Sequence, residues 1–233
     1  FPLTSNAFDQ TFKSTEGFIT KFDNELLTLT SSTFIGGSGS DYIYDKGTTD
    51  NSGYVYVVGT TQSSDFSTTT NAYSNHCKDN FFISKISNNL SSLTASTCIG
   101  SSNLETDPSI ILDNFDDVII TGLSYGNFPT TSGVVMNNNP GGSASIVISK
   151  FNNELSSLKS STFIGGNSLD NSPEVHVDSL NNIIISGFTT SSYYPTTTDA
   201  FDQTYNGNGG DDDGIFSILD TSLSTLLECN NAE

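Results

Sequence analysis

Short runs of hydrophobic residues alternate with polar turns along the chain, and one passage returns at regular intervals. In it, an apolar run is followed, after a turn, by a Ser/Thr-rich run that ends in Ile-Gly. The copies are 18–22 with 31–37, 82–86 with 96–100, and 147–151 with 161–166, and a fourth begins at 215–219. The lysines Lys21, Lys85 and Lys150 recur about every 64 residues, and such a fixed period determines the architecture.

Each period contains four segments that are typical of β-strands. Two are the runs just described. The third covers 42–45, 109–113 and 174–178, and the fourth covers 54–59, 118–122 and 183–187. These segments are short and rich in β-branched and aromatic residues, so they favour strands over helices. Asn- and Asp-containing turns, which tolerate tight bends, separate them.

Four antiparallel strands in each period predict an all-β fold of the β-propeller type, with about three and a half blades in this chain. Residues 1–233 are expected to form one propeller domain or half-propeller. The expected blades cover approximately 16–65, 80–127 and 145–193, with a partial blade at 213–229. A β-sandwich is the alternative, although a sandwich has no reason to repeat every four strands. The last copy never reaches Ile-Gly-Gly, so the open half-blade is expected there.

The repeated motifs resemble those of the SBBP family of β-propeller repeats. The motifs are Phe-Pro-Thr-Thr, then Ala-Phe-Asp-Gln-Thr, Phe-Ile-x-Lys-Phe, Ser-Thr-Phe-Ile-Gly-Gly-Ser-Gly-x-Asp and Val-Tyr-Val-x-Gly-x-Thr. The resemblance covers nearly the whole chain. It implies a propeller and an extracellular or cell-surface protein of a microbe. It implies little about activity, because the repeated residues are core and turn residues.

Composition narrows the possible partners. The charged residues include 7 Lys and no Arg against 26 Asp and Glu, which gives a formal net charge of −19. This balance argues against nucleic-acid binding and would repel anionic membranes while attracting cations. No stretch reaches the roughly 18 apolar residues that span a bilayer. The chain opens in the middle of a repeat, as a processed part of a longer protein or one piece of an assembly would.

Three cysteines are candidates for covalent links. Cys98 stands where Phe34 and Phe163 stand in the other copies, which fits a small buried thiol. The hairpin register also brings Cys77 close to Cys98, so a Cys77–Cys98 disulfide is predicted, as in an oxidising, extracellular setting. Cys229 then remains as a free thiol or a link to another chain.

Two groups of carboxylates are candidate calcium ligands. Asp41, Glu105 and Asp170 follow the Ile-Gly element at the same distance in each copy. They could hold Ca²⁺ at one end of the propeller, or each could accept hydrogen bonds from its own turn. The loop that contains Asp211, Asp212 and Asp213 is Gly- and Asp-rich, which fits either a calcium loop or a solvated acidic loop.

Catalysis has little support, and we expect the protein not to be an enzyme. There are two histidines, His76 and His176, and no catalytic motif. Glycans are possible ligands through tyrosines, although there is no Trp. Asn89 begins the triplet Asn-Leu-Ser and is a predicted N-glycosylation site at a hairpin turn.

The sequence therefore predicts a non-enzymatic, extracellular structural protein, such as a subunit of a surface layer, adhesin or filament. Its open half-blade would be completed by another chain. Two chains could complete a seven-bladed ring, the chain could be half of one propeller, or strand addition could build a fibre. The alternative is a module that binds Ca²⁺ or glycans at its acidic loop end.

Overall fold

The computed structural model describes residues 1–101, 103, 105–207 and 211–232. These residues form fourteen β-strands and no helix. The strands are β1 (Gly17–Phe22), β2 (Leu29–Ile35), β3 (Asp41–Thr49), β4 (Val55–Thr61), β5 (Asn80–Ile86), β6 (Leu93–Ile99), β7 (Thr106–Leu112), β8 (Val118–Ser124), β9 (Ser145–Phe151), β10 (Leu158–Ile164), β11 (Asp170–Val177), β12 (Ile183–Thr189), β13 (Asp213–Leu219) and β14 (Leu226–Ala232). The all-β prediction is confirmed. In the described part of the chain there is no helix with the length and apolarity needed to cross a membrane.

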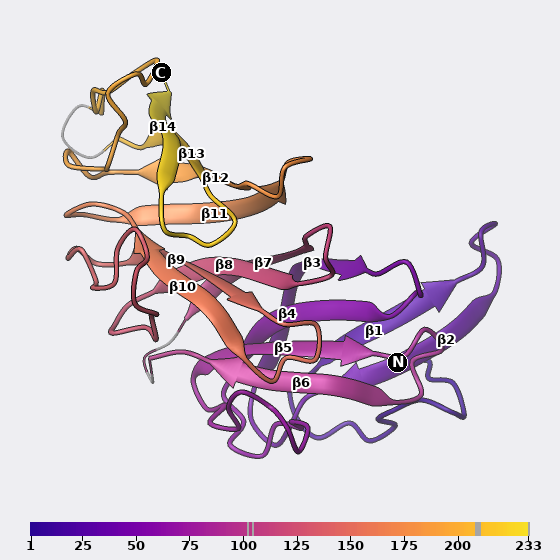
Figure 1. Cartoon of the computed structure of the whole chain (residues 1–233). Helices are drawn as coiled ribbons and strands as arrows, with labels where there is room; N and C mark the ends of the chain where they lie inside the picture. The colour runs from indigo at the N-terminus through magenta and orange to yellow at the C-terminus, as the bar shows by residue number, and fades with distance from the viewer. Residues whose placement is uncertain (102, 104, 208–210, 233) are drawn as a thin grey trace.

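The strands form three four-stranded antiparallel sheets and one two-stranded sheet. The larger sheets follow chain order as β3-β4-β5-β6, β7-β8-β9-β10 and β11-β12-β13-β14, whereas β1 pairs with β2. Figure 1 shows these sheets one after another, from the β1–β2 pair to the sheet that ends in β14.

The blade boundaries expected from the sequence are wrong by half a period. Each four-stranded sheet joins the last two strands of one period to the first two of the next, so that β4 pairs with β5, β8 with β9 and β12 with β13. The expected blades 16–65, 80–127 and 145–193 are therefore replaced by sheets over 41–99, 106–164 and 170–232. Strands 213–219 and 226–232 complete the last sheet, and the two-stranded half-sheet is β1–β2, at the other end of the chain.

Successive sheets pack face to face through three apolar clusters. Ile35 of β2 and Phe82 of β5 belong to the first cluster, and Phe81 and Phe151 to the second. The third joins residues of β7–β10 to residues of β11–β14. A sheet covered on both faces buries successive residues, and all seven residues of β8 and of β9 are buried.

Long loops protect the outer edge of each sheet. The last threonine of the Phe-Pro-Thr-Thr motif bonds to the outermost strand of its own sheet: Thr69 Oγ1 accepts the N–H of Ser96 at 3.2 Å, and Thr131 Oγ1 accepts that of Ser161 at 3.0 Å. Thr4 bonds in the same way to Ser32 of β2. An edge occupied by a loop cannot pair with another chain, which gives this motif a structural role.

The predicted Cys77–Cys98 disulfide is present, with an S–S distance of 2.02 Å. It ties the loop before β5 to β6. Cys229 is a free thiol that is fully buried, 2.8 Å from Ser217 Oγ. Of the two roles left open by the sequence, the buried thiol is the one observed, because a link to another chain would need an accessible sulfur.

Candidate functional site at the open edge of the first sheet

The candidate site lies along β1, which has a hydrogen-bonded neighbour on one side. The strands at the equivalent place in the other sheets are β5, β9 and β13, and each pairs on both sides. Within the described residues, β1 pairs with β2 alone. Its other edge therefore offers a row of backbone N–H and C=O groups to an incoming strand.

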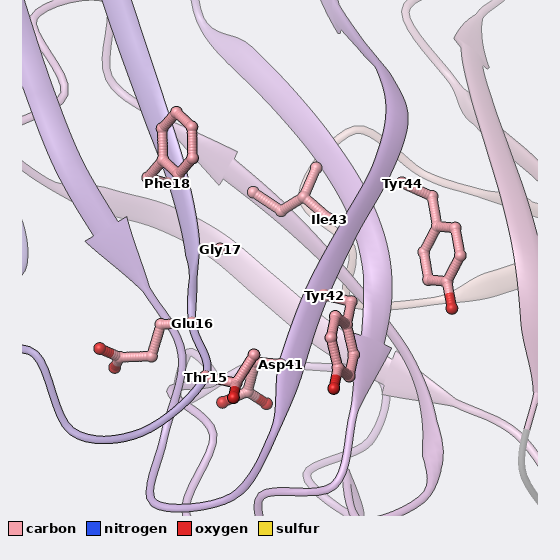
Figure 2. A pocket seen from close by; sticks show the side chains of 8 residues that line it. All are labelled: Thr15, Glu16, Gly17, Phe18, Asp41, Tyr42, Ile43 and Tyr44. Carbon is pink, nitrogen blue, oxygen red and sulfur yellow. The ribbon is translucent and has the colours of Figure 1, made fainter. Parts of the chain in front are cut away.

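A pocket of about 360 Å³ lies beside this edge, between β1 and β3. It is lined by residues 15–18 and 41–44, as Figure 2 shows. In the complete sheets, the second strand packs on the first strand of the next sheet, as β4 does on β7 and β8 on β11. The pocket thus occupies the place on β3 where the second strand of a complete first sheet would lie.

Two buried carboxylates stand at one end of the pocket. Asp41 Oδ2 accepts the N–H of Gly37 at 2.7 Å and the hydroxyl of Ser63 at 2.8 Å. Glu16 Oε2 accepts the N–H of Lys13 at 2.9 Å, and the Lys13 Nζ lies 3.7 Å from Glu16 Oε1. Asp41 Oδ1 and Glu16 Oε1 are buried with no hydrogen-bond partner among the described residues.

Gly36 leaves the space that these two side chains occupy. A Cβ at this position would lie 2.9 Å from Asp41 Oδ2 and 3.1 Å from Glu16 Oε1, which is closer than a side chain normally approaches. Buried oxygens without a donor are costly, so an N–H or O–H group that reached them would bind favourably. The pocket therefore combines an open backbone edge with buried carboxylates at its end.

The two other repeated carboxylates hold their own turns. Glu105 Oε1 accepts the N–H of Ser101 at 3.0 Å and the hydroxyl of Ser124 at 3.3 Å. Asp170 accepts the N–H of Gly166 at 2.9 Å and the hydroxyl of Thr189 at 2.6 Å. Burial raises the pKa of Glu105 to about 7 and also raises the pKa of Asp170. This arrangement matches the turn-binding alternative rather than a calcium ring.

The acidic loop remains a predicted calcium site. Asp211 and Asp212 are exposed, whereas Asp213 is buried and its Oδ2 accepts the N–H of Asn206 at 2.8 Å. Residues 208–210 lie outside the described residues. In the part of the chain that the structure describes, no three His, Cys, Asp or Glu side chains gather as a metal ion would require.

Asn89 and His176, which the sequence also singled out, lie away from the pocket. Asn89 is exposed in the turn between β5 and β6, so its glycosylation stays a prediction. His176 is exposed on β11. Glu16 was not singled out from the sequence. Its one signal is that it stands just before a strand at the position where Asn80, Ser145 and Asp213 stand in the other copies.

Comparison with known proteins assigns no family. No family model and no curated protein matches the chain. Among solved structures, it is similar to the crystal structure of a thermostable family-43 glycoside hydrolase, with 10% identity over 83% of this chain and 73% of the other, and a TM-score of 0.34. This match contradicts the expectation that the protein is not an enzyme, and that expectation is not kept. With so low a TM-score, the match carries no argument about a reaction or a catalytic residue.

Proposed function

We propose that the chain is an extracellular structural module, a β-propeller segment of about three and a half blades that assembles with another polypeptide. Its role would be that of a surface-layer, adhesin or filament subunit. The observation that carries the proposal is the half-sheet β1–β2, which has an open edge and a pocket where the other sheets have a paired strand. Strand addition to such an edge is a common mode of recognition.

The complete sheets indicate what kind of strand would fit. At the position equivalent to Phe18, each complete sheet pairs an apolar residue with a glycine on the second strand. The pairs are Phe82 with Gly59, Val147 with Gly122, and Ile215 with Gly187. A strand of the same type, with a β-branched residue two positions before a glycine and a hydroxyl residue two positions after it, is therefore the expected occupant of the β1 edge.

Two observations support an extracellular setting. The Cys77–Cys98 disulfide is of a kind that persists in oxidising compartments. The resemblance of the repeats to the SBBP family, which remains a hypothesis, points to the same location.

The proposal is tested by measuring association and edge protection on the same sample. Sedimentation velocity over a wide concentration range is expected to show self-association, and amide hydrogen exchange is expected to slow in β1 as the protein associates. The strands β5 and β9 are internal controls, because both of their edges are already paired. A protein that associates while β1 continues to exchange quickly would contradict strand addition, and a monomer at high concentration would contradict assembly.

A further inference from the structure

The outward face of the half-sheet is made of residues that are buried in every other copy. Phe18, Phe22 and Leu26 are 54%, 48% and 74% exposed. Their counterparts are Phe82, Val147 and Ile215 for Phe18, then Ile86, Phe151 and Leu219 for Phe22, and Leu90, Leu155 and Leu223 for Leu26. All nine counterparts are at most 3% exposed. In the interior of the molecule this face is covered by the preceding sheet.

The free face of the last sheet also exposes apolar residues whose counterparts in the preceding sheet are buried. In β7–β10, Ile119, Leu123 and Ile148 of this face are buried against the next sheet. The residues at the same positions of β11–β14 are Ile184, Phe188 and Phe216. Phe188 is 49% exposed and Phe216 is 38% exposed, and Ile184 is half-buried.

Inside the molecule, a backbone hydrogen bond joins each long loop to the turn of the next sheet. The N–H groups of Phe8, Tyr73 and Val135 donate to the carbonyl oxygens of Leu90, Leu155 and Leu223 in the turn of the next sheet, at 2.8–2.9 Å. Phe201 occupies the corresponding place in the last Ala-Phe-Asp-Gln motif. Its N–H donates to Asn230 Oδ1 of its own sheet, and its side chain is 92% exposed. At the other end of the chain, the corresponding turn residue is the exposed Leu26.

The last sheet also lacks the lysine that the others carry. Lys85 and Lys150 each reach the turn of the following sheet, where Lys85 bonds to Asn153 and Lys150 donates to Thr221 Oγ1 at 2.9 Å. Ile218 stands at this position in β13. An apolar residue here suits the turn of the half-sheet, in which Leu26 and Leu27 are 74% and 84% exposed.

We infer that a second copy of this chain packs the free face of its β11–β14 sheet against the outward face of β1–β2, in the way that consecutive sheets pack within one chain. The inference rests on the proposed assembly function and goes further, because it names the partner and the two faces. The contact joins different surfaces of the two copies, so it is heterologous and builds an open array or a closed ring. It leaves the β1 edge free for strand pairing.

The test blocks one face in each of two variants. Phe22→Lys places a charge on the β1–β2 face, and Phe216→Lys places one on the β11–β14 face. Both residues are exposed in the single chain, so both variants are expected to fold, which far-ultraviolet circular dichroism checks. Phe115→Lys, at a 74% exposed residue in the turn of an interior sheet, is the matched control. If either variant misfolds, Leu26→Lys and Phe188→Lys replace the pair.

Sedimentation of the variants distinguishes the possible outcomes. Each variant alone is expected to associate less than the unmodified chain, because one of its two faces is blocked. An equimolar mixture is expected to regain one face-to-face contact between two chains, because each copy retains one usable face. The Phe115→Lys control should associate like the unmodified chain. If single variants associate like the unmodified chain, the head-to-tail contact is overturned while the proposed assembly stands. An unmodified chain that stays monomeric overturns both.

Discussion

At the residue scale, paired hydroxyl groups allow sheets that are buried on both faces to contain many serines. Ser84 bonds to Ser96 and Ser149 to Ser161 across adjacent strands, both at 2.9 Å. Cys229 takes the second position in the last sheet, opposite Ser217. Burial raises the pKa of the Cys229 thiol to about 11, so the thiol stays protonated and unreactive in the folded protein. A polar composition is thus compatible with a well-packed interior, because these buried side chains pair with one another across the strands.

Glu105 is expected to make stability depend on pH. Burial raises its folded-state pKa from the ordinary 4.5 to about 7, so between these values the folded state binds more protons than the unfolded state. The free energy of unfolding therefore falls as pH rises through this window. Glu105→Gln cannot ionise, and it is expected to be more stable than the unmodified protein at pH 8 by on the order of 2–3 kcal/mol and nearly equal to it at pH 4.5.

Urea denaturation at a series of pH values measures this difference. Glu25→Gln, at an exposed position, is the control for loss of one negative charge. Parallel pH profiles for the unmodified protein and Glu105→Gln would contradict the assignment.

At the element scale, ion pairs and turns fasten one sheet to the next. Lys150 of β9 is buried, and its Nζ lies 2.8 Å from Asp113 Oδ2 and 3.4 Å from Asp117 Oδ2. The same ammonium group donates to Thr221 in the turn between β13 and β14. One side chain therefore neutralises two carboxylates of its own sheet and contacts the next.

Lys150→Met is expected to lower the free energy of unfolding by about 3 kcal/mol, because it leaves the buried Asp113 carboxylate without its counter-charge. Lys159→Met is the matched control. It removes an ion pair to Asp117 whose lysine side chain is 46% exposed, and such pairs contribute less than about 1 kcal/mol. Urea denaturation measures the free energy of unfolding of both variants. Equal losses in Lys150→Met and Lys159→Met would contradict the larger contribution of the buried ion pair.

The Cys77–Cys98 bridge closes a loop across 21 residues, and its removal is expected to destabilise the protein by about 3 kcal/mol. The measurement is thermal or urea unfolding of the unmodified protein and of Cys77→Ser/Cys98→Ser. A reductant should reproduce the effect in the unmodified protein and change nothing in the double variant. An unmodified protein whose unfolding midpoint is insensitive to reductant would contradict the prediction.

The sequence repeat predicted the strands and the disulfide between Cys77 and Cys98. It predicted neither the grouping of the strands into sheets nor the pocket beside β1. The period places apolar runs such as 118–122 in strands, and the hairpin register brings Cys77 near Cys98. A period has no starting point, however, so it does not show whether β4 pairs onward with β5 or whether the chain crosses to a new sheet there. The pocket depends on that choice, because it lies where β1 lacks a second strand.

At the scale of the whole molecule, a strongly acidic surface opposes the contacts that the apolar end faces favour. The net charge is −19, so two copies repel each other at long range. Phe18 and Phe22 at one end and Phe188 and Phe216 at the other are the exposed apolar residues that would drive contact.

Self-association is therefore expected to strengthen with salt. Raising NaCl from about 0.01 M to about 0.2 M shortens the range of charge repulsion from about 30 Å to less than 10 Å and leaves apolar contacts intact. Sedimentation equilibrium at both concentrations provides the measurement. Association that weakens on adding salt would indicate an interface held by ion pairs instead.

The offset between sequence repeat and sheet also bears on how the chain is made. During synthesis, β3 and β4 leave the ribosome well before β5 and β6, which belong to the following period. Each new stretch of polypeptide finishes the sheet begun by the stretch before it, so a nascent chain that has just completed one sequence repeat ends in a half-formed sheet with an unpaired edge. Until the next repeat is made, that edge is open to pairing with other chains, so the unfinished polypeptide is prone to aggregation.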